Sequence, residues 1–327
     1  MKKICVIGAG AIGGYLAVEL ALSGNEVCVI ARGEHLGSIR KDGLRLRIGG
    51  REKTAHVAAS DQPSDFGPQD VVICALKAHQ AWQQCERFAP LLGQDTSVVT
   101  AMNGIPWWYF YRSGGALEGT HLESVDRDAR QWNAIGPGRA IGCVVDPACA
   151  VVAPGIIEHH EFKRFTVGEP DGSMSARVQA LAHTLIDAGF DAPVRNNVRW
   201  NIWLKLWGNA CFNPISLLTG ATLDRITSEP GLRSICTTVM RECRFVAKAL
   251  DVDIPEAMIE RRLDVAGQAT GHKMSMLQDL ESGRSIELDA LVTAVHELGA
   301  LTRVATPAVD MLLALARARG RQAGIYG

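Results

Sequence analysis

The chain has 327 residues, of which 47% are apolar and 21% are charged, and its formal net charge is -1. This length and composition favour a globular protein with two domains and well-packed cores. The mixed charges provide no basic surface for nucleic acid or an anionic membrane, and no run is long and apolar enough to cross a bilayer, which argues against both as partners.

The nine cysteines are scattered, without C-x-x-C or zinc-ligand spacing. We therefore expect a reduced, cytoplasmic protein in which most cysteines are small core residues. No metal site is expected. His159, His160 and Glu161 are adjacent on an expected strand, where neighbouring side chains face opposite sides, so we expect them at the surface.

The first residues predict a strand, a glycine turn, a helix and a second strand. Ile4–Ile7 is an apolar run, and glycines follow it with the G-x-G-x-x-G spacing that opens a helix. Two lysines before an apolar stretch also resemble a signal peptide, but the glycines and Glu19 favour a buried strand and an amphipathic helix. The second strand is expected at Glu26–Ala31.

This arrangement favours dinucleotide binding over an ordinary glycine-rich turn. The first glycine permits the tight turn, the second lets a pyrophosphate approach the backbone, and the third lets helix and strand pack closely. The helix N-terminus adds N–H donors and the positive end of a dipole. The residues expected to bind the cofactor here are Gly8, Gly10, Ala11, Ile12 and Gly13.

The residue after the second strand indicates which dinucleotide binds. NAD-binding chains normally have an Asp or Glu there for the ribose 2′-hydroxyl, whereas this chain has Arg32. A guanidinium suits a 2′-phosphate, so NADP is the expected cofactor. The alternative is a solvated loop arginine, with Glu34 nearby.

The chain continues with the alternating strands and helices of a doubly wound parallel sheet. We expect short strands within Leu44–Ala58, strands at Val71–Leu76 and Ser97–Met102, and a helical stretch around His79–Leu91. The aromatic cluster Trp107–Tyr111 suits an interface, a substrate lid or the core.

A smaller, antiparallel extension is expected next. Its strands are predicted at Ile141–Val145, Gly155–Glu158 and Arg164–Gly168, after a polar stretch at Glu118–Asn133 that suits loops or a short helix. Ser175–Ala188 then predicts a helix.

From about Arg195, predicted helices follow one another and β-branched runs disappear. The expected fold is therefore α/β, with a Rossmann-type doubly wound domain over residues 1–194 and an all-helical domain over residues 195–327. Pro255 and Pro307 are expected in first helical turns. The helices expected in the second domain are Arg199–Phe212, Gly231–Leu250, Pro255–Ala266, Ile286–Leu298 and Pro307–Arg319.

The chemistry is expected where the two domains meet, because open parallel sheets bind ligands beyond the carboxyl ends of their strands. Lys77 and Asn103 each follow such a strand, although either could be a solvated loop residue. One side of a predicted helix carries a polar row at four-residue steps, formed by Lys205, Asn209 and Asn213. This row either lines a wet cleft or faces solvent without binding a ligand. The residues expected in the core beside them are Trp200, Trp203 and Trp207.

Taken together, these residues resemble the ketopantoate reductase family, the 2-dehydropantoate 2-reductases. The matching pieces span nearly the whole chain in the family's order: GAGAIGG, Arg32, LKAHQ around Lys77, NG at Asn103, KLWGNACFNP and SMLQDLESGRSIELD. The resemblance implies a Rossmann domain joined to a helical domain. It also implies NADPH-dependent reduction of 2-dehydropantoate to (R)-pantoate, a step toward pantothenate and coenzyme A.

The resemblance further implies a role for each site residue. Lys205 would act as the general acid, with Glu287 beside the lysine and the substrate. Lys77 and Asn103 would line the cofactor and the catalytic cleft. The residues that would bind the substrate are Asn209, Asn213 and Ser275.

These roles agree with elementary chemistry. Hydride arriving at a 2-oxo carbon leaves negative charge on its oxygen, which a lysine ammonium can stabilise and protonate. Glu287, two residues after Ser285 at an expected helix start, would be ionised and would keep Lys205 charged. A first-turn glutamate favoured only by the helix dipole is the alternative.

Other functions stay open on the sequence. Residues 107–133 are longer and more aromatic than in compact bacterial members and follow Asn103 closely, so a paralogous reductase of another 2-oxo acid is an alternative. A β-hydroxyacid dehydrogenase is disfavoured by the S-M-L-Q-D piece and the paired asparagines. A non-enzymatic NADP-sensing protein would not need Lys205, Asn209 and Glu287 in these positions. The oligomeric state is left open, and a homodimer would be unsurprising.

Overall fold

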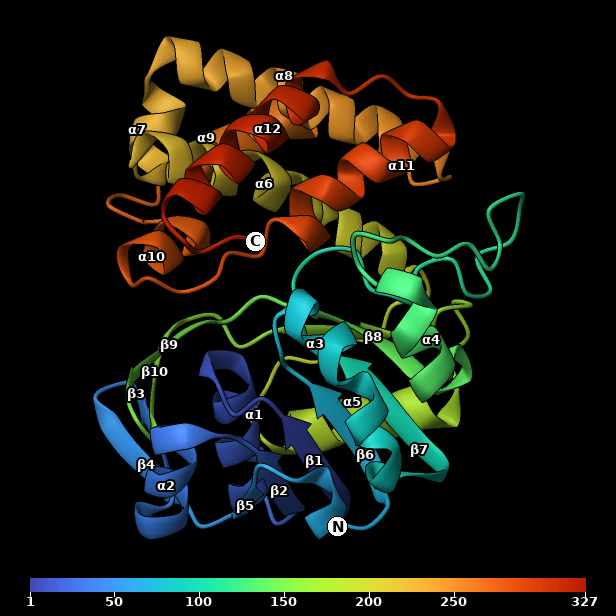
Figure 1. Cartoon of the computed structure of the whole chain (residues 1–327), viewed down its shortest axis with the longest axis vertical. Helices are drawn as coiled ribbons and strands as arrows, with labels where there is room; N and C mark the ends of the chain where they lie inside the picture. Colours follow the sequence, from blue (N-terminus) through green and yellow to red (C-terminus); the bar gives the residue numbers. More distant parts are fainter. The chain divides into compact units, whose positions relative to one another are not determined.

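The computed structural model describes every residue from Met1 to Gly327 and divides into two compact units, Met1–Val198 and Arg199–Gly327. The first unit combines sheets and helices, and the second is helical (Figure 1). The predicted α/β fold class with a helical C-terminal part is confirmed. The sequence pattern divides the chain after residue 194, and the units divide after Val198. No helix combines the length and apolarity needed to cross a membrane.

The first unit is built on a seven-stranded sheet in the order β11-β8-β7-β6-β1-β2-β5. Every neighbouring pair is parallel except β8 and β11. Because β2 lies on one side of β1 and β6 on the other, the winding of the sheet reverses beside β1, where doubly wound sheets bind their ligands. The strands are β1 (Lys3–Ile7), β2 (Glu26–Ile30), β5 (Ala58–Ser60), β6 (Gln69–Cys74), β7 (Leu92–Thr100), β8 (Ala140–Val145) and β11 (Phe165–Gly168).

A second sheet has four strands in the order β4-β3-β10-β9. Its strands are β3 (Leu44–Ile48), β4 (Arg51–Ala55), β9 (Ala148–Ala153) and β10 (Ile156–Glu161). The predicted smaller antiparallel extension is confirmed only in part. Strand β11 pairs antiparallel with β8, but β8 continues the main parallel sheet, and β10 lies in the second sheet, antiparallel to β9 and parallel to β3. Strand β9 was not predicted, since its sequence ACAVVA does not alternate between apolar and polar residues.

Helix α1 (Ala11–Leu22) packs between the two sheets of the first unit. Its residues from Gly13 to Leu20 are all buried, so the predicted amphipathic helix is wrong. Glu19 is the only charged residue of this helix, and the Nζ of Lys53 on β4 lies 2.7 and 2.8 Å from its two carboxylate oxygens. An ion pair between the buried Glu19 carboxylate and the partly exposed Lys53 ammonium therefore replaces the expected solvent-facing side.

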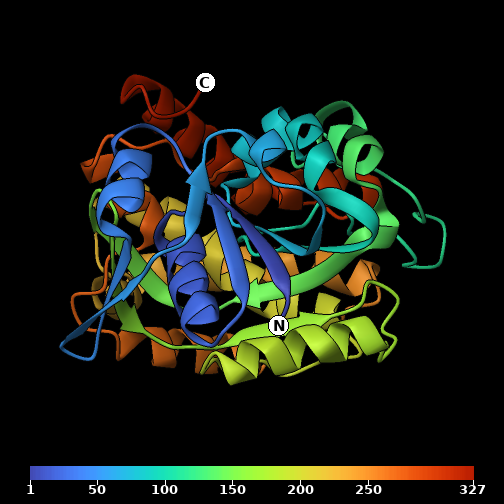
Figure 2. The ribbon, with the colours of Figure 1, turned by 90° about the horizontal axis from the view of Figure 1, so that it is seen from below.

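The longest of the remaining helices of the first unit is α5, which runs beside the main sheet in yellow-green in Figure 2. The predicted helical stretch His79–Leu91 is divided, since α3 ends at Gln84 and a 3-10 helix with an internal proline follows. Ser175 caps α5, as its Oγ accepts a hydrogen bond from the Val178 N–H at 3.2 Å. These elements are α2 (Gly33–Asp42), α3 (Ala78–Gln84), α4 (Arg130–Ile135), α5 (Ala176–Asp187) and the 3-10 helices Pro63–Asp65, Cys85–Leu91, Arg127–Ala129 and Pro137–Arg139.

The aromatic cluster between β7 and β8 is part of the core, one of the three roles that the sequence left open. Trp107, Trp108, Tyr109 and Phe110 are each no more than 4% exposed. The indole Nε1–H of Trp108 donates to the hydroxyl of Thr100 on β7 at 3.0 Å. Trp108 therefore packs against the C-terminal end of β7.

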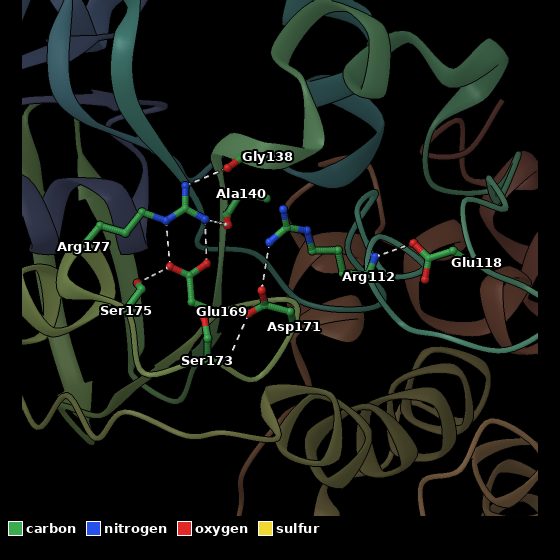
Figure 3. A network of polar contacts seen from close by, with 9 residues as sticks. All are labelled: Arg112, Glu118, Gly138, Ala140, Glu169, Asp171, Ser173, Ser175 and Arg177. Atoms are coloured by element: carbon green, nitrogen blue, oxygen red, sulfur yellow. Dashed lines mark hydrogen bonds and ion pairs between the residues drawn. The ribbon is translucent and has the colours of Figure 1, made fainter.

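A polar network fixes this aromatic segment to the loop between β11 and α5 (Figure 3). The guanidinium of Arg177 binds the buried carboxylate of Glu169 through two hydrogen bonds of 2.7 and 2.6 Å. Arg112, from the aromatic segment, donates to Asp171 at 2.9 Å. The Arg177 guanidinium also donates to the backbone carbonyls of Gly138 and Ala140. These hydrogen bonds offset part of the cost of burying the Glu169 carboxylate.

The second unit contains a cluster of helices around buried tryptophans. Trp203 and Trp207 are fully buried as predicted, whereas Trp200 is only partly buried. Pro307 begins α12 as predicted, but Pro255 precedes a turn and α9 starts only at Met258. The elements are α6 (Val198–Thr219), α7 (Leu223–Ser228), α8 (Pro230–Ala249), α9 (Met258–Gly267), α10 (Ser275–Glu281), a π-helical turn (Asp289–Thr293), α11 (Ala294–Thr302) and α12 (Pro307–Gln322).

Candidate active site

The glycine turn after β1 leaves room for a ligand at one of its three glycines. Gly8 has a φ of +91°, in the left-handed region, and a Cβ on Gly13 would lie 2.0 Å from the Gly8 carbonyl oxygen. The fold itself therefore requires both glycines. Gly10 differs, because a Cβ there would meet nothing within 4 Å. Open space over this glycine is what an approaching pyrophosphate needs.

The N-terminus of α1 can receive an anion. Gly10 is its N-cap, no side chain caps it, and its first turn has no acidic residue. The first N–H groups of a helix have no acceptor within the helix. Those of Ala11, Ile12 and Gly13 therefore form a donor set of the kind that binds phosphate.

The predicted cofactor residues of the first unit form a row along the carboxyl edge of the main sheet. Asn103 follows β7, Lys77 follows β6, the glycine turn follows β1 and Arg32 follows β2. These four strands are parallel neighbours in that order, so the row spans about 14 Å at the usual strand spacing. Arg32 is exposed at the N-cap of α2, and Lys77 is half-buried at the N-cap of α3.

The amide oxygen of Asn103 supports a ligand at this edge. It is buried and has no hydrogen-bond donor in the protein. Such an unsatisfied acceptor costs about 1–3 kcal/mol, and native structures contain few of them. The carboxamide of a nicotinamide carries an N–H₂ donor that would satisfy it. Together with the space over Gly10, this acceptor makes the residues present fit a nicotinamide dinucleotide.

Helix α6 carries the polar row predicted in the second unit. Lys205 and Asn209 are half-buried, and Asn213 is 1% exposed. The structure joins Asn213 to Ser275, because the Asn213 Oδ1 accepts hydrogen bonds from the Ser275 hydroxyl and the Met276 N–H, both at 3.1 Å. Helix α10 receives its cap from this amide, since its own N-cap residue supplies none.

Glu287 lies in the segment before the π-helical turn. That turn begins at Asp289, so the predicted position of Glu287 in a first helical turn is wrong. The segment is held on both sides by the end of the chain. The Ile286 N–H donates to the Ile325 carbonyl at 3.1 Å, and the Tyr326 hydroxyl donates to Asp289 at 2.8 Å.

Sequence reasoning missed Arg262, which lies against Gly208, the residue before Asn209 on α6. A Cβ on Gly208 of α6 would be 3.0 Å from both Nε and Nη2 of Arg262, so the guanidinium rests directly on this glycine. Gly208 and Lys205 are three positions apart and therefore share a helix face. The available signal was the glycine itself, because a glycine inside a helix costs about 1 kcal/mol relative to alanine and indicates close packing.

The two histidines of β10 differ in their exposure. No group of three or more His, Cys, Asp or Glu side chains is arranged to hold a metal ion. His160 and Glu161 are exposed as predicted. His159 is partly buried, because its ring packs against Tyr15 with 4.8 Å between the ring centroids.

Comparisons with known proteins agree along the whole chain. Residues 4–172 match the family model described as Ketopantoate reductase PanE/ApbA, and residues 197–320 match Ketopantoate reductase PanE/ApbA C terminal. The chain is 50% identical over 325 residues to a 2-dehydropantoate 2-reductase of Mesorhizobium japonicum, covering 99% of each chain. A 2-dehydropantoate 2-reductase of Lactococcus lactis is 26% identical, with 97% of each chain covered.

Solved structures give the same result. A protein of Ralstonia solanacearum MolK2, provisionally a ketopantoate reductase, has a TM-score of 0.95, 41% identity and 100% coverage of both chains. The 2-dehydropantoate 2-reductase of Methylococcus capsulatus has a TM-score of 0.82 and 26% identity, covering 98% of this chain and 97% of that one. A D-mandelate dehydrogenase with NADH and anilino(oxo)acetate has a TM-score of 0.86 at 22% identity, covering 99% and 100%, and shows the fold alone.

Proposed function

The chain belongs to the ketopantoate reductase family, and on that premise we propose that it reduces 2-dehydropantoate to (R)-pantoate with NADPH. Membership makes the chain a nicotinamide-dependent oxidoreductase. The observation that carries the proposed substrate is the 50% identity to a 2-dehydropantoate 2-reductase over 99% of both chains. The product would feed pantothenate and coenzyme A synthesis.

The proposed cofactor is NADPH rather than NADH. The exposed guanidinium of Arg32 at the start of α2 can pair with a 2′-phosphate, which an acidic residue there would repel. Lys77 and Asn103 would contact the nicotinamide half at the ends of β6 and β7. When bound, NADPH supplies the hydride. The pyrophosphate would be bound by Gly8, Gly10, Ala11, Ile12 and Gly13.

Lys205 is the proposed general acid. Its ammonium would stabilise the negative charge that develops on the 2-oxo oxygen and deliver a proton to that atom. The carboxylate of Glu287 would accept a hydrogen bond from the substrate hydroxyl and keep Lys205 charged. In this proposal the cation Lys205 acts on the 2-oxo oxygen and the anion Glu287 acts on the substrate hydroxyl.

Three residues are proposed to orient the substrate: Asn209, Asn213 and Ser275. The Oδ1 of Asn213 accepts hydrogen bonds from Ser275 and Met276. A contact between Asn213 and the substrate would therefore use its N–H₂ group as the donor.

We propose a cytoplasmic location, because all nine cysteines are free and a reducing compartment keeps them so. The homodimer stays a prediction.

The decisive experiment follows NADPH loss spectrophotometrically with 2-dehydropantoate and with a panel of other 2-oxo acids, including an aromatic one. We expect the highest kcat/KM with 2-dehydropantoate. A higher kcat/KM with another 2-oxo acid would identify that acid as the substrate, and the proposal of a 2-oxo acid reductase would stand. No oxidation with any of them would favour a β-hydroxyacid dehydrogenase, assayed in the oxidative direction, or an NADP-sensing protein. A parallel series with NADH tests the cofactor.

A further inference from the structure

The imidazole of His35 joins two segments of the first unit that are distant in sequence. Its Nε2 lies 2.6 Å from the carbonyl oxygen of Ala9 in the glycine turn. Its Nδ1 lies 3.0 Å from the backbone nitrogen of Gly155, in the turn between β9 and β10. His35 itself is in the first turn of α2, whose N-cap is Arg32. One ring therefore connects the turn that is predicted to bind pyrophosphate with α2, whose N-cap residue is Arg32.

The partners determine where the ring proton lies. The Gly155 N–H can only donate, so Nδ1 accepts and carries no proton. Nε2 is then the protonated nitrogen of the neutral ring, and it donates to the Ala9 carbonyl. Both nitrogens are engaged, and the ring is held in one orientation.

Backbone contacts on both sides of the ring show that it sets the distance between the glycine turn and α2. The N–H groups of Gly8 and Ala9 donate to the Ile30 carbonyl at the end of β2, at 3.0 and 3.3 Å. On the other side, a Cβ on Gly155 would lie 3.0 Å from the Cβ of Ser38, so α2 packs closely on the turn between β9 and β10. His35 lies between these two contacts and couples the glycine turn to α2.

We propose that His35 is a positioning residue for the nucleotide. It holds the glycine turn and the N-terminus of α2, with Arg32, at the spacing that the 5′-phosphate and the 2′-phosphate of one adenosine require. The inference rests on the proposed use of NADP. It differs from a direct contact, because the ring acts on the ligand only through the Ala9 backbone and the placement of Arg32.

This role predicts a pattern among ligands. NADPH and 2′,5′-ADP carry both phosphates and engage both ends of the spacing, whereas 5′-AMP carries only the phosphate for the glycine turn. Removing the ring should therefore weaken the first two ligands more than the third. If the ring only stabilised the fold, removing it would lower the melting temperature. The dissociation constants of the folded protein for all three ligands would then stay at their wild-type values.

The test compares His35→Ala, His35→Gln and His35→Asn, with His183→Ala on the exposed side of α5 as the matched control. We expect His35→Ala to weaken NADPH and 2′,5′-ADP by about tenfold in calorimetric titrations, with a smaller effect on 5′-AMP. The glutamine amide can reach the Ala9 carbonyl and should restore most of the affinity. The asparagine oxygen can reach only the Gly155 N–H and should restore the melting temperature without the affinity.

Equal NADPH affinity in His35→Ala and the wild type would overturn the inference. So would identical affinities for all three substitutions alongside unequal melting temperatures. If His35→Ala does not fold, the difference between the glutamine and asparagine variants decides. Tighter wild-type binding of NADH than of NADPH would contradict the proposed cofactor instead. That comparison uses the wild type alone, so it is distinguished from a failure of the His35 role, which the variants report.

Discussion

The hydroxyl of Ser275 donates to the Oδ1 of Asn213 at 3.1 Å, although 62 residues separate the two along the chain. The same oxygen accepts the Met276 N–H, so an amide of α6 caps α10. Two residues proposed to bind the substrate are thus held together by the protein's own hydrogen bonds. Such support keeps a binding group in place before its ligand arrives.

Replacing Asn213 with alanine should therefore reduce stability as well as substrate binding. The Met276 N–H would be left buried without its acceptor, and the free energy of unfolding should fall by about 1–3 kcal/mol in urea denaturation. Ser275→Ala keeps the hydrogen bond from the Met276 N–H to Asn213, so its free energy of unfolding should fall less. Asn209→Ala, at a half-buried position, serves as the control and should change stability by about 0.5 kcal/mol or less. Wild-type stability of Asn213→Ala would contradict the capping role.

Lys205→Ala should remove most of the turnover. Loss of a general acid typically lowers kcat by about 100-fold or more, and the NADPH dissociation constant should stay near the wild-type value. Steady-state kinetics and nucleotide titration measure the two effects separately. Lys248→Ala, at an exposed position on α8, is the matched control. Full activity of Lys205→Ala would exclude this lysine from the mechanism.

Gly208→Ala should show an energetic coupling to Arg262. An alanine inside a helix normally gains about 1 kcal/mol over glycine. Here the new Cβ would lie 3.0 Å from the guanidinium, so the gain should be absent with Arg262 in place. It should reappear when Gly208→Ala is made together with Arg262→Ala. A double-mutant cycle of unfolding free energies measures the coupling, and additive effects would show that the two residues do not interact.

Tyr326→Phe should loosen the segment that carries Glu287. Burial and the hydrogen bond to Asp289 raise the pKa of Tyr326, so its hydroxyl stays protonated and donates at neutral pH. Without that donor, kcat/KM for the 2-oxo acid should fall by roughly fivefold, the worth of one hydrogen bond. The NADPH dissociation constant should not change. Asp289→Asn keeps an oxygen acceptor, so its kcat/KM should fall less than that of Tyr326→Phe. A larger fall in Asp289→Asn would count against the proposed role of the Tyr326–Asp289 hydrogen bond.

Asp171 should contribute to acid stability. Hydrogen bonds from Ser173, together with the Arg112 guanidinium, lower the pKa of Asp171 from 3.8 to about 2. Because the pKa is lower in the folded state, the stabilisation is present above about pH 4 and is lost as the pH falls toward 2. Asp171→Asn should flatten the decline of the unfolding free energy across this range, as measured by urea denaturation at stepped pH. An unchanged slope would show that the pair with Arg112 is too solvated to matter.

The sequence by itself determined the parts of this protein that depend on local chemistry. Gly8, Gly10 and Gly13 lie within one strand-turn-helix unit, where spacing alone specifies the turn. Lys77 and Asn103 could be placed at one sheet edge because the carboxyl ends of parallel strands lie together. The helical character of the second unit followed from its periodicity in the same way.

The tertiary structure decided every relationship that depends on which segments pack together. Helix α1 lacks a polar side because a second sheet covers it, and no pattern within α1 reveals that β4 brings Lys53 to Glu19. The His35 bridge crosses 26 residues on one side and 120 on the other, and the cap of α10 comes from α6. Hydrogen bonds of this kind have no sequence period, because they are formed by strand order and helix packing rather than by neighbouring residues.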